Sequence, residues 1–214
     1  MKKSIRLILL LLFISIHGLY AQRTMFAYAL NYQRILHYYR SNELFSKGIA
    51  DNLNKYGENT NLFANGFILQ NKLLSNWSLS NGFFIGKFRF INGDVIGKTG
   101  GNAFFISSPI TTNYNFRFGK IDPTIGLGFN NYLALFSTSE DEYSGSPFDN
   151  LNPAMRRYTI SALLQAGINL AIGQESRLRV QFEFEQHLRP VTSGSVRLNP
   201  TGLGISLGYY LMVR

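Results

Sequence analysis

The sequence predicts an all-β protein, an eight-stranded antiparallel transmembrane β-barrel of up-and-down topology. Apolar and polar residues alternate along most of the chain. The segments that show this pattern are joined by short turns and long polar connections in alternation. The 214 residues include 18 Phe, 12 Tyr and 20 Gly, whereas charged residues make up only 15%. Alternating strands, aromatic side chains and this spacing of turns are typical of barrels that cross a bilayer.

The N-terminal segment MKKSIRLILLLLFISIHGLYAQ has the features of a secretory signal peptide. Three basic residues precede the apolar run Leu7–Ile16, and Ala21 is a small residue at the expected cleavage position. We therefore expect cleavage after residues 1–21, with residues 22–214 forming one outer-membrane barrel domain. A retained anchor helix is the alternative, but the apolar run is shorter than the roughly 20 residues that span a bilayer.

The composition limits the kinds of site that the chain can hold. There is no cysteine, which excludes a disulfide, a thiolate nucleophile and a cysteine metal site. The formal net charge of +9 falls to +6 once the three basic residues of the N-terminal segment are removed. The remaining basic residues are scattered, so we expect no nucleic-acid partner. One of the three histidines lies in the N-terminal segment, and we expect neither a metal site nor a cofactor.

Eight segments alternate with a period of two, as strands with one apolar face do. The second segment is ambiguous. The third changes its apolar face at Phe88 and Phe90, which predicts either a bulge near Gly86 or a different register. In chain order the segments are Thr24–Tyr39, Leu62–Leu74, Trp77–Phe90, Ala103–Phe118, Ile121–Phe136, Arg157–Ile172, Arg177–Arg189 and Thr201–Val213.

Each well-defined segment has an apolar face at every second position. The opposite faces of the fifth, sixth and eighth segments carry mainly Gly, Ser, Asn and Thr, and that of the seventh is charged. The apolar faces begin with Phe26, Tyr28 and Leu30; Trp77, Leu79 and Phe83; Ile106, Ile110 and Tyr114; Ile125, Leu127 and Phe129; Ile160, Leu164 and Ile168; Leu178, Val180 and Phe182; and Leu203, Ile205 and Leu207.

The connections between segments alternate in length. Ser75-Asn76, Gly119-Lys120 and Gly173–Ser176 are tight turns, whereas the other connections are long and polar. This alternation and the even number of strands are typical of bacterial outer-membrane barrels, and they predict that both termini lie on the periplasmic side. The long connections are about 40–61, 91–102, 137–156 and 190–200.

The faces made of small polar residues indicate which side of each strand points into the barrel. An eight-stranded barrel is just wide enough to be filled by side chains, so small polar residues suit its interior and bulky aliphatic residues suit lipid. The alternative, a soluble lipocalin-like carrier, would place many Lys and Glu on its surface. Arg34 and Lys87 are the charged exceptions on the predicted lipid face, and Arg34 can extend its charge to the loop-side rim.

The inward positions include charged residues that predict a polar network in the lumen. Buried charges of mixed sign must be paired, so we interpret this set as a structural plug, with a narrow polar conduit or proton path as the alternative. The set comprises Arg117, Asp122, Arg157, Arg179, Glu183, Glu185, His187 and Arg189.

Two enzymatic interpretations of the same residues are weaker. Glu183 and Glu185 lie about 7 Å apart on one strand face, whereas an acid–base pair needs groups opposed across a substrate. His187 with Ser193 or Ser195 is a possible lipid hydrolase, but the spacing defines no catalytic order. We expect no catalytic residues.

Two long connections carry further candidates. Glu140, Asp141, Glu142 and Asp149 form an acidic loop that is a weak candidate for a cation site, because it lacks calcium-binding spacing. In the first connection, four residues at helical spacing behind the capping residue Asn42 predict a short extracellular helix on the barrel rim or, equally, a partner-docking surface. These four are Phe45, Ile49, Leu53 and Tyr56.

Three stretches resemble a known family. They are ISSPITTNYNFRFGKIDPTIGLGFNNYLALF, ISALLQAGINLAIGQESRLRVQFEFEQHL and LNPTGLGISLGYYL, within Phe104 to Leu211. They resemble the small outer-membrane β-barrel proteins common in Bacteroidetes, including PorT-like proteins. The resemblance implies a barrel without catalytic residues to transfer. It implies varied roles, including protein secretion for some relatives.

The sequence thus favours a non-enzymatic integral outer-membrane barrel with a filled polar lumen. Its expected role is structural or adhesive, or that of an accessory subunit of an envelope complex. Its expected partners are outer-membrane lipids, including lipopolysaccharide, and envelope proteins. A narrow transport pore is the first alternative, and a lipid-modifying enzyme is the second.

Overall fold

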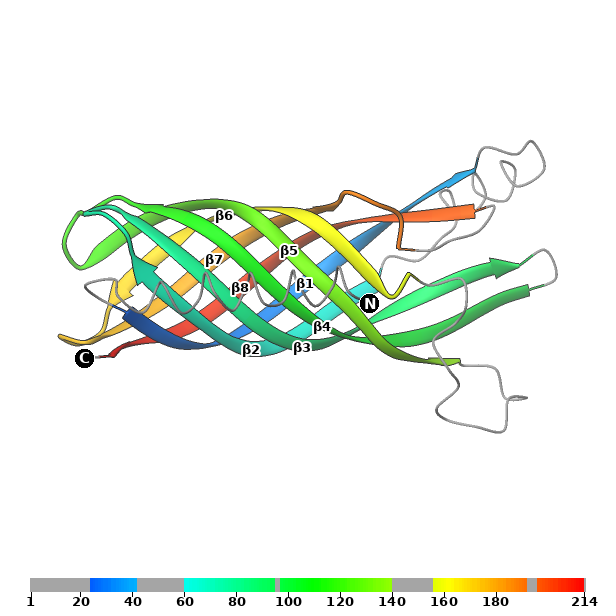
Figure 1. The fold of residues 1–214 in the computed structure, drawn as a ribbon, viewed down its shortest axis with the longest axis horizontal. Coiled ribbons are helices and arrows are strands. Elements are labelled where there is room, and N and C mark those ends of the chain that lie inside the picture. The colour runs from blue at the N-terminus through cyan, green and yellow to red at the C-terminus, as the bar shows by residue number, and fades with distance from the viewer. Residues whose placement is uncertain (1–23, 42–59, 95–96, 140–155, 192–195, 214) are drawn as a thin grey trace, which may run out of the picture.

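A computed structural model describes residues 24–41, 60–94, 97–139, 156–191 and 196–213, and within these ranges all regular structure is β-strand (Figure 1). Among the described residues no helix is long and apolar enough to span a membrane. The expected signal peptide, the acidic-loop cation site and the helix in the first connection lie outside the described residues. The strands are β1 (Thr24–Ser41), β2 (Thr60–Lys72), β3 (Trp77–Asp94), β4 (Gly97–Asn115), β5 (Ile121–Ser139), β6 (Tyr158–Ala171), β7 (Ser176–His187) and β8 (Val196–Val213).

The eight strands form one closed antiparallel barrel in sequence order, as predicted. Each strand pairs with the next, and β8 closes the barrel on β1 from Thr24 opposite Val213 to Ser41 opposite Val196. We start at Phe26 and move from each residue to its paired residue on the next strand. One circuit of the barrel ends on β1 at Leu36, ten residues after the start. This stagger tilts the strands and leaves a narrow interior that side chains fill.

The short turns lie at one end of the barrel. In Figure 1 they are at the left, together with the start of β1 and the end of β8. The β4–β5 turn contains Gly119 with a φ of 103°, a left-handed conformation that favours glycine. The start of β1 therefore lies beside the end of β8 at the short-turn end.

The outer face of the barrel is apolar, and the buried side chains are mostly polar. Outward residues such as Leu127 and Phe182 expose 65% and 66% of their surface. Among the described residues, 21 polar or charged side chains are buried, against 13 hydrophobic ones. A water-soluble protein has the opposite distribution, so this arrangement is that of a barrel whose outer face meets lipid.

Some polar residues on the outer face lie near its edge, and others are hydrogen-bonded to one another. Arg34 lies ten residues after Thr24. In a strand tilted by about 40°, ten residues extend about 25 Å along the barrel axis, which is the height of a typical apolar band. Elsewhere on the outer face, a chain of hydrogen bonds links four outward residues of neighbouring strands. The Tyr158 hydroxyl donates to Asn131, the Asn131 amide donates to the Ser108 carbonyl oxygen, and the Ser108 hydroxyl donates to Asn81.

The expected bulge near Gly86 is wrong. The pairing of β3 with β2 and β4 runs through Gly86 without a shift, and Gly86 faces inward, where a Cβ would meet the Phe105 ring. The register instead shifts between Phe104 and Phe105, where β5 carries one extra residue. The side chains of Phe88 and Phe90 lie outside those that the structure describes.

We predict that Gly128→Ala destabilises the barrel. A Cβ at Gly128 would overlap the backbone carbonyl oxygen of Ile110 on β4 and would lie 2.7 Å from the Thr111 Cα, so a strand must move. Such overpacking costs about 1–3 kcal/mol. Urea unfolding in lipid vesicles measures the loss. Gly173→Ala is the control, because its Cβ meets only the Ser176 hydroxyl at 3.0 Å. Equal stability of the two variants would contradict this packing.

Candidate functional site

The barrel interior holds the candidate site, and four of the eight predicted lumen residues are buried in it. Asp122, Arg179, Glu183 and Glu185 expose 6%, 4%, 6% and 1% of their surface. The fifth, His187, lies at the loop-side end of β7 and is half-buried, with its ring 5.1 Å from the ring of Tyr132.

The predicted burial of Arg117, Arg157 and Arg189 in the lumen network is wrong, because all three are exposed, and Arg117 lies at the short-turn mouth of the interior. Each lies just beyond a strand, where the alternation of the sequence continues but the β-ladder that would fix the direction of the side chain has ended. The Arg117 guanidinium donates to the backbone carbonyl oxygen of Ser75 in the β2–β3 turn.

The two buried glutamates accept hydrogen bonds from neutral side chains. Glu183 accepts from the Gln165 amide at 2.8 Å, from the Gln33 amide at 3.3 Å and from the Asn31 amide. Glu185 accepts from the same Gln33 amide at 3.1 Å and from the Ser161 hydroxyl. The donors come from β1 and β6, so the carboxylates of β7 tie together two strands that are not neighbours of one another.

Arg179 forms a second set of contacts closer to the short-turn end. Its guanidinium donates to the Gln70 side-chain oxygen at 2.8 Å, to the Tyr210 hydroxyl at 3.2 Å and to the Asn169 side-chain oxygen. The Arg179 guanidinium carbon also lies 4.3 Å from the centroid of the Tyr210 ring. These partners belong to β2, β6 and β8, so one side chain of β7 reaches across the lumen.

The expected pairing of lumen arginines with Glu183 and Glu185 is therefore wrong. Arg179 and Glu183 are four residues apart on one strand, about 13 Å in extended backbone, and their side chains bind different partners. The buried carboxylate of Asp122 does form an ion pair, with Arg177 at 3.0 Å, at the short-turn end. Amide and hydroxyl donors, not cations, satisfy the buried carboxylates of Glu183 and Glu185.

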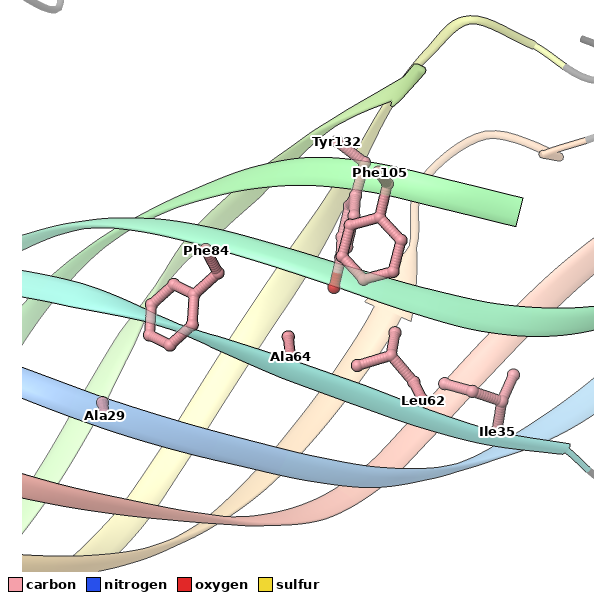
Figure 2. Packing of buried hydrophobic residues seen from close by; sticks show 7 residues of the cluster. All are labelled: Ala29, Ile35, Leu62, Ala64, Phe84, Phe105 and Tyr132. Carbon is pink, nitrogen blue, oxygen red and sulfur yellow. The ribbon is translucent and has the colours of Figure 1, made fainter. Parts of the chain in front are cut away.

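An apolar cluster fills the loop-side part of the lumen, against the walls formed by β1 to β5 (Figure 2). The rings of Phe105 and Tyr132 pack edge to face, with centroids 5.2 Å apart. The alternation of the sequence did not predict this cluster. The ambiguity of the second segment was the available signal, because Leu62 and Ala64 point inward while Phe63 points outward. The cluster comprises Ala29, Ile35, Leu62, Ala64, Phe84, Phe105 and Tyr132.

Three cavities along the interior differ greatly in size. One of about 30 Å³ lies between Arg179 and the apolar cluster, and one of about 40 Å³ lies beside His187 and Val191. A cavity of about 320 Å³ lies at the short-turn end, against Arg117 and Arg177. The two small cavities have room for about one water molecule each.

The interior offers little to the alternative chemistries. No group of three His, Cys, Asp or Glu side chains that could hold a metal ion is found among the described residues. Glu183 and Glu185 share the Gln33 amide donor rather than facing each other across a substrate cleft. Ser193 and Ser195, considered with His187 as a hydrolase, lie outside the described residues.

Comparison with known proteins supports the fold. No family model matches the chain, and no curated relative is found. The chain is similar to Neisserial surface protein A, with a TM-score of 0.53, 10% identity, and coverage of 88% of this chain and 96% of that one.

Two further solved structures show weaker similarity. Outer Membrane Protein W of E. coli has a TM-score of 0.45 and 16% identity over 89% of this chain and 98% of its own. Ail, the attachment invasion locus protein of Yersinia pestis, has a TM-score of 0.41 and 12% identity over 87% and 97%. The chain thus has the small transmembrane β-barrel fold, as the likeness to Neisserial surface protein A shows.

We predict that replacing Glu183 and Glu185 together with Ala destabilises the barrel. The change leaves the amide donors of Asn31, Gln33 and Gln165 without acceptors, and each unpaired buried donor costs about 1–3 kcal/mol. The Ser161 hydroxyl keeps the Asn130 carbonyl oxygen as its acceptor. Urea unfolding followed by the fluorescence of the single tryptophan measures the effect.

The matched control replaces both glutamates with Gln, which keeps the size of each side chain and one acceptor oxygen. This variant should lose less stability than the double Ala variant. A double Ala variant that unfolds at the wild-type urea concentration would show that the network contributes nothing.

Proposed function

We propose that the protein is an integral outer-membrane barrel with a sealed lumen, and that it acts without catalysis. Its role is structural, adhesive, or that of an accessory subunit in an envelope complex. In this proposal the signal peptide exports the chain, the termini and short turns face the periplasm, and the long connections face outward. Outer-membrane lipids, including lipopolysaccharide, surround the apolar band.

The observation that carries the proposal is the filling of the lumen at two levels. Arg179 and its partners Gln70, Asn169 and Tyr210 reach across the barrel near the short-turn end. The apolar cluster occupies the loop-side part, and the cavity between the two levels is only about 30 Å³. A hydrated ion needs a continuous wet path, so the filled lumen favours a barrel that acts through its surfaces.

The two alternatives have less support. A narrow pore would need the Arg179 contacts and the apolar cluster to move apart together. A lipid-modifying enzyme would need reactive groups that reach a lipid, whereas His187 packs on Tyr132 in the interior. The resemblance to PorT-like proteins stays a prediction, since no family model matches the chain.

We predict that the purified protein inserted into planar bilayers gives no reproducible single-channel steps, because no wet path crosses the two filled levels. A large porin prepared in the same way is the positive control for insertion and recording.

Arg179→Ala distinguishes leakage from conduction. If the wild-type protein gives steps and their conductance changes in Arg179→Ala, the current passes through the lumen. That result would contradict the sealed barrel and support the pore. Steps that are the same in both proteins arise outside the lumen.

A further inference from the structure

The cavity at the short-turn end is the largest of the three and differs from the rest of the interior in its charge. It measures about 320 Å³, which falls within the size range of small-molecule sites. Ser75 and Gly119 of two short turns line it, together with residues near the ends of the strands. A small solute can therefore fit at this mouth without passing the Arg179 level.

Four cationic side chains line this cavity, against one carboxylate. The cations are Lys72, Arg117, Arg177 and Arg179, and the carboxylate is that of Asp122. Asp122 is already engaged, because it accepts a hydrogen bond from the Phe118 backbone N–H at 3.1 Å and pairs with Arg177 at 3.0 Å. Even without counting Lys72, three guanidinium groups line the cavity against this one carboxylate.

Two of the arginines keep donors that a ligand can use. A guanidinium has five N–H groups in a planar fork that matches the oxygens of phosphate and carboxylate. Within the described part of the chain, Arg117 binds the Ser75 carbonyl oxygen and Arg177 binds Asp122. Each uses one nitrogen in these contacts, whereas Arg179 is committed to three partners of its own.

The surroundings strengthen the attraction of this site for anions. A cleft lined by charges of one sign and enclosed by walls of low dielectric constant concentrates its electric field. Lipid around the outer face supplies such a wall for a barrel in a membrane. We propose that the short-turn cavity binds a small soluble molecule through an oxyanion, a phosphate or a carboxylate group, held by Arg117 and Arg177. The site lies outside the Arg179 level, so it does not depend on whether the lumen is sealed.

Isothermal titration calorimetry on the purified protein in a neutral maltoside detergent tests this proposal. Inorganic phosphate is the probe in one arm and citrate in the other, with sodium chloride holding the ionic strength constant. Saturable binding is expected in at least one arm, and the active arm identifies the class of oxyanion. Arg117→Gln with Arg177→Gln should weaken that binding about tenfold or more, as the loss of charged hydrogen bonds does.

Lys120→Gln is the matched control, because Lys120 is exposed in the β4–β5 turn but does not line the cavity. It should leave the affinity within twofold of the wild type. The single variant Arg117→Gln changes only a residue of the β4–β5 turn. It tests the site if the double variant fails to fold. Saturable binding in neither arm would overturn the proposal. So would equal weakening by Lys120→Gln, which would show attraction by net charge alone.

Discussion

The structure depends on the closure of its backbone hydrogen bonds, from the β1–β2 pair round to the β8–β1 pair. In the hydrocarbon part of a bilayer no water can satisfy a backbone N–H or C=O group, so a sheet with an open edge is excluded there. The pairing of β1 with β8 extends over the full length of both strands and removes that edge. Closure then fixes two surfaces, because successive side chains point alternately to lipid and into a narrow lumen.

The narrow lumen explains the contacts found inside it. Glu183, Glu185 and Arg179 are buried, yet they bind amides, hydroxyls and a tyrosine ring rather than one another. Such contacts join strands across the barrel and brace its walls. The apolar cluster completes the filling on the loop side, where bulky residues of β1 to β5 occupy the space. In the part of the chain that the structure describes, the outer surface and the cationic mouth at the short-turn end remain accessible.

Much of the fold was predictable because strand alternation is a local property with a period of two. Strand order, the positions of the short turns and the inward placement of Glu183 and Glu185 follow from it. The placement of Arg117, Arg157 and Arg189 does not, since alternation in sequence does not mark where pairing ends. The partners of Glu183 were also beyond prediction, because they depend on which side chains of distant strands meet in the closed barrel. In β2 both faces carry apolar residues, so the sequence pattern did not show whether Leu62 points into the lumen or outward.

Cysteine cross-linking between β1 and β8 tests the closed barrel most directly, and the natural chain contains no cysteine to interfere. Leu30 and Leu207 are paired on the outer face, so the variant with both changed to Cys should form an intramolecular disulfide on oxidation. Cysteines at Leu30 and at Leu127, four strands away on β5, should not. Closure predicts a change in gel mobility, reversed by reduction, for the first pair only. Absence of a cross-link there, or its formation in both pairs, would contradict the closed barrel.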